Sequence, residues 1–167
     1  QIYFKESENQ SSVYPKQIAF NVIPQCDIFL DNNFTKEEMK LTWETHKILD
    51  PNIQVQATCV RVPVFNGHSE AVFFRVSKEI SREEIIKILD KAPGLKVLDD
   101  PSSGGYPTPF ENATDTEDVY VGRIRSQSLD DDCWISMWIV ADNVYGKGAA
   151  LNAVQICEEL LNVSSVK

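Results

Sequence analysis

One stretch of the chain decides its fold class: Ala71-Val72-Phe73-Phe74-Arg75-Val76, then Ser81-Arg82-Glu83-Glu84-Ile85-Ile86-Lys87-Ile88-Leu89, then Leu95-Lys96-Val97-Leu98. The first run predicts a strand, because β-branched and aromatic residues dominate it. Ser81 and Glu84 have the spacing of a capping box, so a helix is expected from there to about Lys91. Pro93-Gly94 ends this helix before the last run, a second strand. The stretch therefore predicts strand, helix and strand in succession.

Toward the N-terminus the same alternation of elements continues. The apolar run 18–23, closed by Pro24, predicts a short buried strand. A second capping box, Thr35 with Glu38, predicts a helix over 36–49. Residues 53–65 alternate between apolar and polar, which is typical of a strand.

Toward the C-terminus, a Pro-, Gly-, Ser- and Thr-rich segment over 99–118 predicts a long surface loop. Strands are expected at 119–125 and 134–140, and an apolar stripe at helical spacing predicts a last helix over about 148–161. Helices interleaved with short-linked strands indicate an α+β, two-layer fold. We expect a mixed, largely antiparallel sheet with helices on one face.

Composition narrows the classes of function. The 167 residues, 43% hydrophobic and 25% charged, suit one soluble globular domain. A formal net charge of −9 disfavours nucleic acid as a partner. No apolar run approaches the roughly 20 residues of a membrane-spanning helix, so we expect a soluble, cytoplasmic protein without a membrane partner. The four cysteines form no C-x-x-C pair and are expected to be reduced core thiols, and no cluster has metal-ligand spacing.

The first residues differ in character from the rest. Residues 1–16 are polar and irregular, which predicts a linker from a region that is absent here. The chain begins with Gln1 rather than Met, which suggests a fragment. A domain is expected to start at residue 17 and to extend to residue 142.

Arg61 is a cation on an otherwise apolar strand face. A guanidinium in such a place needs an anion or a polar outlet, and its planar fork suits a carboxylate. The alternative, which the strand pattern alone favours somewhat, is an arginine that reaches past the strand end to a structural Asp or Glu.

Four other polar residues could also carry chemistry. His68 follows a glycine-containing turn between two strands, where it could act as an acid or base near neutral pH, although such a histidine is more often a surface residue. Glu37 and Lys40 lie one helical turn apart and could hold an ammonium and a phosphate, but such pairs usually form a solvated face. Asn143 lies where a strand leads into the last helix, and most such turns contain Asn for backbone reasons.

A resemblance spans nearly the whole chain from Gln17 to Leu161. It is carried, in this order, by Ile18-Ala19-Phe20-Asn21-Val22-Ile23-Pro24, Thr35-Lys36-Glu37-Glu38-Met39-Lys40 with Glu44-Thr45, Ala57-Thr58-Cys59-Val60-Arg61-Val62-Pro63-Val64-Phe65, Gly67-His68-Ser69-Glu70, Val121-Gly122-Arg123-Ile124-Arg125 and Gly148-Ala149-Ala150-Leu151-Asn152-Ala153-Val154-Gln155-Ile156. Together these segments resemble the aspartate-semialdehyde dehydrogenase family.

The resemblance implies an NADP-dependent enzyme of lysine, threonine and methionine biosynthesis. The family converts L-aspartyl phosphate to L-aspartate semialdehyde and phosphate through a cysteine thioester. The chain would be its substrate-binding and dimerisation domain, similar to the C-terminal domain of glyceraldehyde-3-phosphate dehydrogenase, and would form a homodimer. The segment 143–167 would carry the helix that packs on the nucleotide-binding domain.

The resemblance also implies a role for each candidate residue. Arg61 would hold the substrate carboxylate and His68 would be the catalytic acid/base. Glu37 would meet the substrate amino group and Lys40 the phosphate. Asn143 would contact the NADP cofactor.

The sequence departs from the family pattern in two places. None of the four cysteines has the Asn-Cys-Ser/Thr context of the family's nucleophile, and there is no G-x-x-G nucleotide loop. We therefore expect the chain to be inactive alone. Two alternatives are an N-acetyl-glutamyl-phosphate reductase-like enzyme and a non-catalytic dimerisation module. The pair Glu37 and Lys40 argues against the first, because an acylated amine needs no carboxylate partner.

Overall fold

The computed structural model describes residues 13–130, 132–146 and 149–164. The chain divides into two compact units, Gln1–Pro63 and Val64–Lys167. Most of the predicted linker, residues 1–12, lies outside the described residues, and residues 13–16 form bends.

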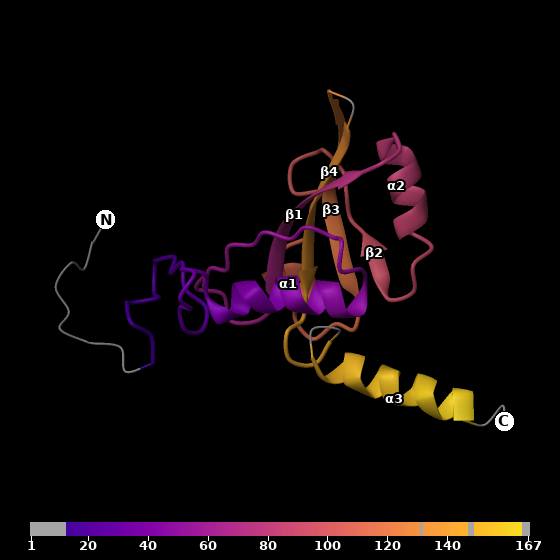
Figure 1. Cartoon of the computed structure of the whole chain (residues 1–167). Helices are drawn as coiled ribbons and strands as arrows, with labels where there is room; N and C mark the ends of the chain where they lie inside the picture. The colour runs from indigo at the N-terminus through magenta and orange to yellow at the C-terminus, as the bar shows by residue number, and fades with distance from the viewer. Residues whose placement is uncertain (1–12, 131, 147–148, 165–167) are drawn as a thin grey trace. The chain divides into compact units, whose positions relative to one another are not determined.

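The second unit is built on a four-stranded sheet (Figure 1). Its strands are β1 (His68–Val76), β2 (Leu95–Val97), β3 (Val119–Leu129) and β4 (Asp132–Ala141). They lie in the order β1-β4-β3-β2, with β4 antiparallel to both neighbours and β2 parallel to β3. The predicted mixed, largely antiparallel sheet is therefore confirmed.

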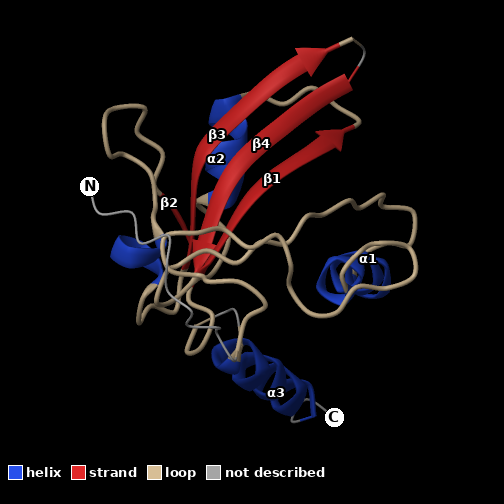
Figure 2. Cartoon of the chain, turned by 90° about the vertical axis from the view of Figure 1, so that its left-hand side faces the viewer, coloured by secondary structure: helices blue, strands red, loops and turns tan. Residues whose placement is uncertain are grey.

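One face of the sheet is covered by α2 (Arg82–Leu89), which lies behind the strands in Figure 2. The predicted capping box is present, with Ser81 and Glu84 each bonding the backbone of the other. Ile85 projects from this helix and is 5% exposed, and such burial contributes about 2 kcal/mol. It packs in one cluster with apolar residues of two strands: Val121, Ile124, Ile135 and Met137. The predicted order of strand, helix and strand is confirmed.

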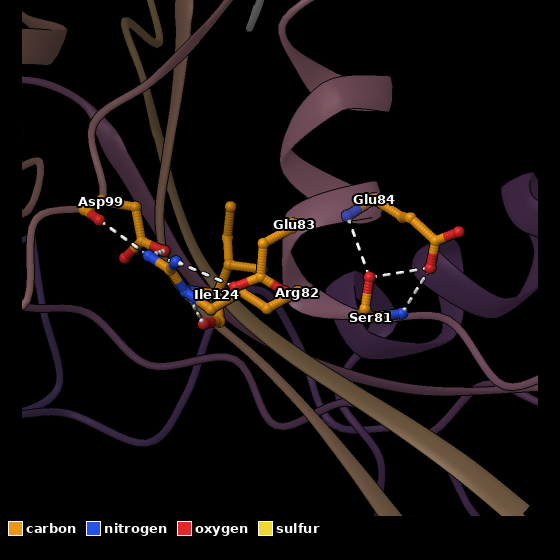
Figure 3. Close-up of polar contacts among 6 residues, drawn as sticks. All are labelled: Ser81, Arg82, Glu83, Glu84, Asp99 and Ile124. Carbon is orange, nitrogen blue, oxygen red and sulfur yellow. Dashed lines mark hydrogen bonds and ion pairs between the residues drawn. The ribbon is translucent and has the colours of Figure 1, made fainter.

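The ladder between β3 and β4 shifts register between Gly122 and Arg125. Polar contacts secure this bulge, as Figure 3 shows. The carboxylate of Asp99 accepts the Ile124 N–H at 3.2 Å and pairs with Arg82 Nη2 at 2.7 Å. Arg82 Nε in turn donates to the Ile124 carbonyl at 3.2 Å. The start of α2 and the end of β2 are thereby joined at the bulge.

The predicted long loop over 99–118 contains one short helical segment, the π-helix η1 (Pro109–Ala113). Part of the loop crosses the sheet face opposite α2, where the Trp138 indole donates to the Pro107 carbonyl at 3.0 Å. Gly122 permits this crossing, since a Cβ there would lie 2.6 Å from Pro107 Cδ and closer still to the Leu98 carbonyl. The loop is therefore packed in place.

The first unit has one helix, α1 (Lys36–Ile48), among its described residues, and it begins at the predicted capping box. The two predicted strands at 18–23 and 53–65 are wrong, because a single bridge between Ile23 and Arg61 replaces them. The alternation of apolar and polar residues correctly indicated which side of the segment is less exposed, because residues 55, 57 and 59 are less exposed than 54, 56 and 58. A strand also needs a neighbour along its length, which one bridge does not provide.

The last helix is α3 (Ala150–Ser164). Its predicted start at residue 148 lies outside the described residues. Several of its apolar side chains are more than half exposed, including Val154, Ile156 and Leu160. No helix among the described residues combines the length and apolarity that crossing a membrane requires.

The cysteines differ in environment. Cys133 is buried beside the Ser126 hydroxyl, Cys26 and Cys59 are half-buried, and Cys157 on α3 is exposed. The expectation of core thiols is therefore confirmed for Cys133 and wrong for Cys157. Helical spacing placed Cys157 on an apolar stripe, but this stripe is largely exposed.

Candidate functional site

The start of α1 is anchored by a buried carboxylate. Glu38 Oε2 accepts the Thr35 N–H at 2.7 Å, and its Oε1 accepts the Cys59 N–H at 2.9 Å. Both hydrogen bonds lower the pKa of Glu38, and the bond from Thr35 has the larger effect. The first turn of the helix is therefore tied to the segment that leads to Arg61.

Glu37 and Lys40 project from the same turn of α1 and form an ion pair of 3.1 Å between Oε2 and Nζ. The hydrogen bond to Glu37 raises the pKa of Lys40, which keeps the amine charged. Both side chains are more than 40% exposed, so the pair adds little stability. This exposure fits a solvated face as well as a pair that a ligand could reach.

The backbone of Arg61 is held by the bridge to Ile23, with N–H to carbonyl distances of 2.8 and 3.0 Å. Its guanidinium carbon lies 5.3 Å from the centroid of the Tyr14 ring, a cation–π distance. Among the described residues no carboxylate forms an ion pair with Arg61. The alternative of a structural Asp or Glu partner therefore finds no support in this part of the chain.

The thiol of Cys26 lies within electrostatic range of charged residues of the first unit. Burial raises the pKa of its thiol, Arg61 lowers it, and Glu37 and Glu38 raise it. Arg61 and Glu37 therefore both lie within electrostatic range of Cys26, and Lys40 is paired with Glu37. The sequence analysis did not single out Cys26 from the other three cysteines.

His68 is the first residue of β1 and pairs with Ala141, the last residue of β4. Its side chain is exposed at this end of the sheet. Gly67 before it has φ +92°, and a Cβ there would lie 3.2 Å from the Cβ atoms of Pro109 and Ala113. Only glycine satisfies both the dihedral and the space.

Asn143 lies beside this turn. Its Oδ1 accepts the Gly67 N–H at 2.9 Å, so the structure brings Asn143 to the residue before His68. His68 and Asn143 belong to the second unit, whereas Arg61, Glu37 and Lys40 belong to the first.

Asp142, which the sequence analysis missed, holds the turn that carries Asn143. It is 3% exposed, and its Oδ1 accepts the N–H groups of Val144, Tyr145 and Gly146 at 2.7, 2.7 and 3.2 Å. Its Oδ2 accepts the Asp115 N–H at 3.0 Å. The signal in the sequence was an Asp after a strand and before a glycine, the pattern of an Asx turn.

Replacing Asp142 with alanine is expected to destabilise the chain by about 3 kcal/mol at neutral pH, because buried N–H groups lose a charged acceptor. The bond from Val144, assisted by the other N–H groups, lowers the pKa of Asp142 in the folded protein. Its contribution is therefore complete above the unfolded pKa of about 4 and is lost as the pH falls through the lower folded value. The thermal unfolding midpoints of the wild type and of Asp142→Ala, taken between pH 7 and pH 2, measure this contribution. The difference between the two midpoints should disappear in acid.

The control is Asp132→Ala, which removes an exposed carboxylate paired with Arg75 at 2.9 Å. This change should cost less than about 1 kcal/mol. An Asp142 variant that unfolds at the same temperature as this control would contradict the assignment.

Among the described residues, no group of three His, Cys, Asp or Glu side chains comes together as a site for a metal ion.

The chain matches the family described as "Semialdehyde dehydrogenase, dimerisation domain" over residues 3–145. It is 52% identical over 149 residues to an aspartate-semialdehyde dehydrogenase of Legionella pneumophila, across 89% of this chain and 42% of that protein.

Solved structures agree with this match. The crystal structure of aspartate semialdehyde dehydrogenase II from Vibrio cholerae has a TM-score of 0.84 and 46% identity, and covers 91% of this chain and 44% of that one. The enzyme has also been solved complexed with ASA. Aspartate semialdehyde dehydrogenase with NADP from Candida albicans has a TM-score of 0.66 and 26% identity, and covers 90% of this chain and 46% of that one.

The chain therefore spans less than half the length of each of these relatives. The structural likeness confirms the expected fold class. Since the family match extends over residues 3–145, the chain belongs to the semialdehyde dehydrogenase dimerisation-domain family.

Proposed function

We propose that the chain is the C-terminal, substrate-binding and dimerisation part of an NADP-dependent aspartate-semialdehyde dehydrogenase. The observation that carries the proposal is that Arg61 and Glu37 both act electrostatically on the Cys26 thiol while Lys40 pairs with Glu37, in a chain of this family. The whole enzyme would convert L-aspartyl phosphate to L-aspartate semialdehyde and phosphate. It would act in the cytoplasm, in the biosynthesis of lysine, threonine and methionine.

The charges of the first unit match those of an aspartyl phosphate. The substrate carries a carboxylate, an ammonium and a phosphate. Arg61 offers a planar fork to the carboxylate and Glu37 a carboxylate to the ammonium. Lys40, whose pKa is raised by its bond to Glu37, offers a positive charge to the phosphate. A zwitterionic acyl phosphate is complementary to this set.

His68 would exchange the proton of the reaction. When aspartate semialdehyde is the substrate, the sulfur of a thiol of the longer protein would bond to the aldehyde carbon, the C=O double bond would become a single bond, and the oxygen would take up a proton as the hydroxyl of a thiohemiacetal. We assign that proton to the His68 imidazole, which is exposed and whose backbone is held by the sheet ladder.

When bound, NADPH would supply the hydride for reduction and NADP⁺ would accept it in the reverse direction. Asn143 suits a contact with this cofactor, because its Oδ1 is occupied by Gly67 while its amide nitrogen donates no hydrogen bond within the described residues. The chain has no G-x-x-G loop for the pyrophosphate, so most of the cofactor would be bound elsewhere in the longer protein.

The test is NADP reduction by the full-length gene product with aspartate semialdehyde and phosphate. Activity that depends on phosphate is expected from the full-length protein, and none from residues 1–167 alone. A folded full-length protein that carries the nucleophilic cysteine and shows no activity would overturn the proposal, and a non-catalytic dimerisation module would then account for the chain. The N-acetyl-glutamyl-phosphate reductase-like alternative is not favoured by relatives that are aspartate-semialdehyde dehydrogenases.

We further propose that a second copy of the protein covers the sheet face opposite α2. Alternation along the strands places Phe73 of β1 and Trp134 of β4 on that face, because their neighbours Val72 and Ile135 belong to the core. Phe73 is 68% exposed and Trp134 40% exposed. An exposed aromatic sheet face in a family named for dimerisation suits a two-fold, face-to-face interface.

Replacing Phe73 with aspartate is expected to convert the full-length dimer to a monomer. A two-fold interface buries residue 73 from each copy, so the change places two unpaired charges in an apolar contact. Sedimentation velocity measures the mass of both proteins. Phe110→Asp, at an 86% exposed position on η1, is the matched control and should remain dimeric. A Phe73 variant that keeps the wild-type mass would refute this interface.

A further inference from the structure

The backbone before His68 has few contacts that could hold it. Residues 64–66 are exposed, and Phe65 is 101% exposed. The ladder to β4 begins only at His68, which pairs with Ala141. The Gly67 N–H therefore lies just beyond the end of the ladder. Its hydrogen bond to Asn143 Oδ1, at 2.9 Å, holds the backbone one residue before the strand begins.

Asn143 itself is held from the other side. Asp142, which precedes it, accepts four backbone N–H bonds and is 3% exposed, so the turn that follows β4 has little freedom. A Cβ on Gly67 would lie 3.2 to 3.3 Å from Pro109, Ala113 and the Ala141 carbonyl, so this position has no room for a side chain. The constrained turn of Asn143 thus holds the less constrained Gly67 peptide through one hydrogen bond.

We infer that Asn143 is a positioning residue for His68, and that its side-chain oxygen fixes the peptide from which the imidazole projects. This rests on the proposed function, because it assumes that His68 is the acid/base. Asn143 would then have two polar ends with separate tasks: the oxygen holds Gly67, and the nitrogen would be available to NADP. A shift of the peptide by about 1 Å would displace the His68 imidazole and slow the reaction by up to about 100-fold.

The experiment compares Asn143→Ala with Asn143→Asp in the full-length enzyme. Alanine removes the acceptor, so kcat should fall about 10- to 100-fold while the KM for aspartate semialdehyde changes by less than about threefold. Aspartate retains an oxygen acceptor and should recover most of the lost kcat. Asn32→Ala is the control, because the Asn32 oxygen likewise accepts a backbone N–H, that of Phe34 at 3.2 Å, in the other unit. Its kcat should stay within about twofold of wild type.

Two outcomes would overturn the inference. If aspartate is as poor as alanine and both raise the KM for NADP, Asn143 acts through its nitrogen on the cofactor alone. If Asn143→Ala lowers the unfolding midpoint but leaves kcat unchanged, the bond is merely structural.

Hydrogen exchange separates this inference from the proposed function. The Gly67 N–H should exchange about tenfold faster in Asn143→Ala and at the wild-type rate in Asn143→Asp, whether or not the protein is active. If the wild-type protein proves inactive but the Gly67 N–H still exchanges faster in Asn143→Ala, the contact stands and only the dehydrogenase reaction is rejected. Unchanged exchange in Asn143→Ala would reject the positioning contact itself.

Discussion

Replacing Arg61 with alanine should lower kcat/KM of the full-length enzyme for aspartate semialdehyde by about 100- to 1,000-fold. A fork of two charge-assisted hydrogen bonds to the substrate carboxylate is lost, and the carboxylate then enters the site without a partner. Most of the effect should be in KM, because the carboxylate is bound equally in the substrate and in the transition state. Steady-state kinetics at several substrate concentrations measure both constants.

Two further variants show whether the fork or merely the charge matters. Arg61→Lys keeps one positive charge without the planar pair of donors, so it should recover only part of the loss. Lys47→Ala, in the last turn of α1, removes an exposed cation and should leave kcat/KM within about twofold of wild type. An Arg61→Ala protein that loses stability but keeps its KM would show that the cation–π contact with Tyr14 is structural.

Replacing His68 with alanine should lower kcat by about 100- to 10,000-fold while leaving the KM for aspartate semialdehyde nearly unchanged. The imidazole is assigned to proton transfer rather than to ground-state binding, so its loss affects the barrier. The rate of NADPH formation at saturating substrate measures this directly.

The chain offers a matched control in its one other histidine. His46 Nε2 lies 2.8 Å from the Ile53 carbonyl, a contact within the first unit. His46→Ala should cost some stability and retain kcat within a few-fold, on the order expected for a packing residue. Equal kcat values for the two histidine variants would remove His68 from the proton-transfer step.

The sequence by itself determined the elements whose signals are local. Both capping boxes were found, at Thr35 with Glu38 and at Ser81 with Glu84, because such a box is a contact between residues three apart. The pairing of Glu37 with Lys40 followed from the helical repeat in the same way. The strands of the second unit followed from runs of apolar residues that one buried face requires.

Where an element depends on a distant partner, the sequence was less informative. The segments 18–23 and 53–65 have the composition of strands, yet they meet only at Ile23 and Arg61. The bulge between Gly122 and Arg125 is held by Asp99, which belongs to another segment. The sequence of the strand itself did not predict this bulge. Strand pairing is a contact between distant residues, so composition identifies a candidate without its neighbour.

The candidate site shows the same division. Residue type and resemblance pointed to Arg61, His68, Glu37, Lys40 and Asn143, and the local charge pattern supported the helical pair. Only the tertiary structure placed the Asn143 oxygen on the Gly67 amide, across 76 residues of chain, and buried Asp142 among four N–H donors. These contacts form because β1 and β4 are neighbours in the sheet, and strand order is a property of the folded chain that no local spacing encodes.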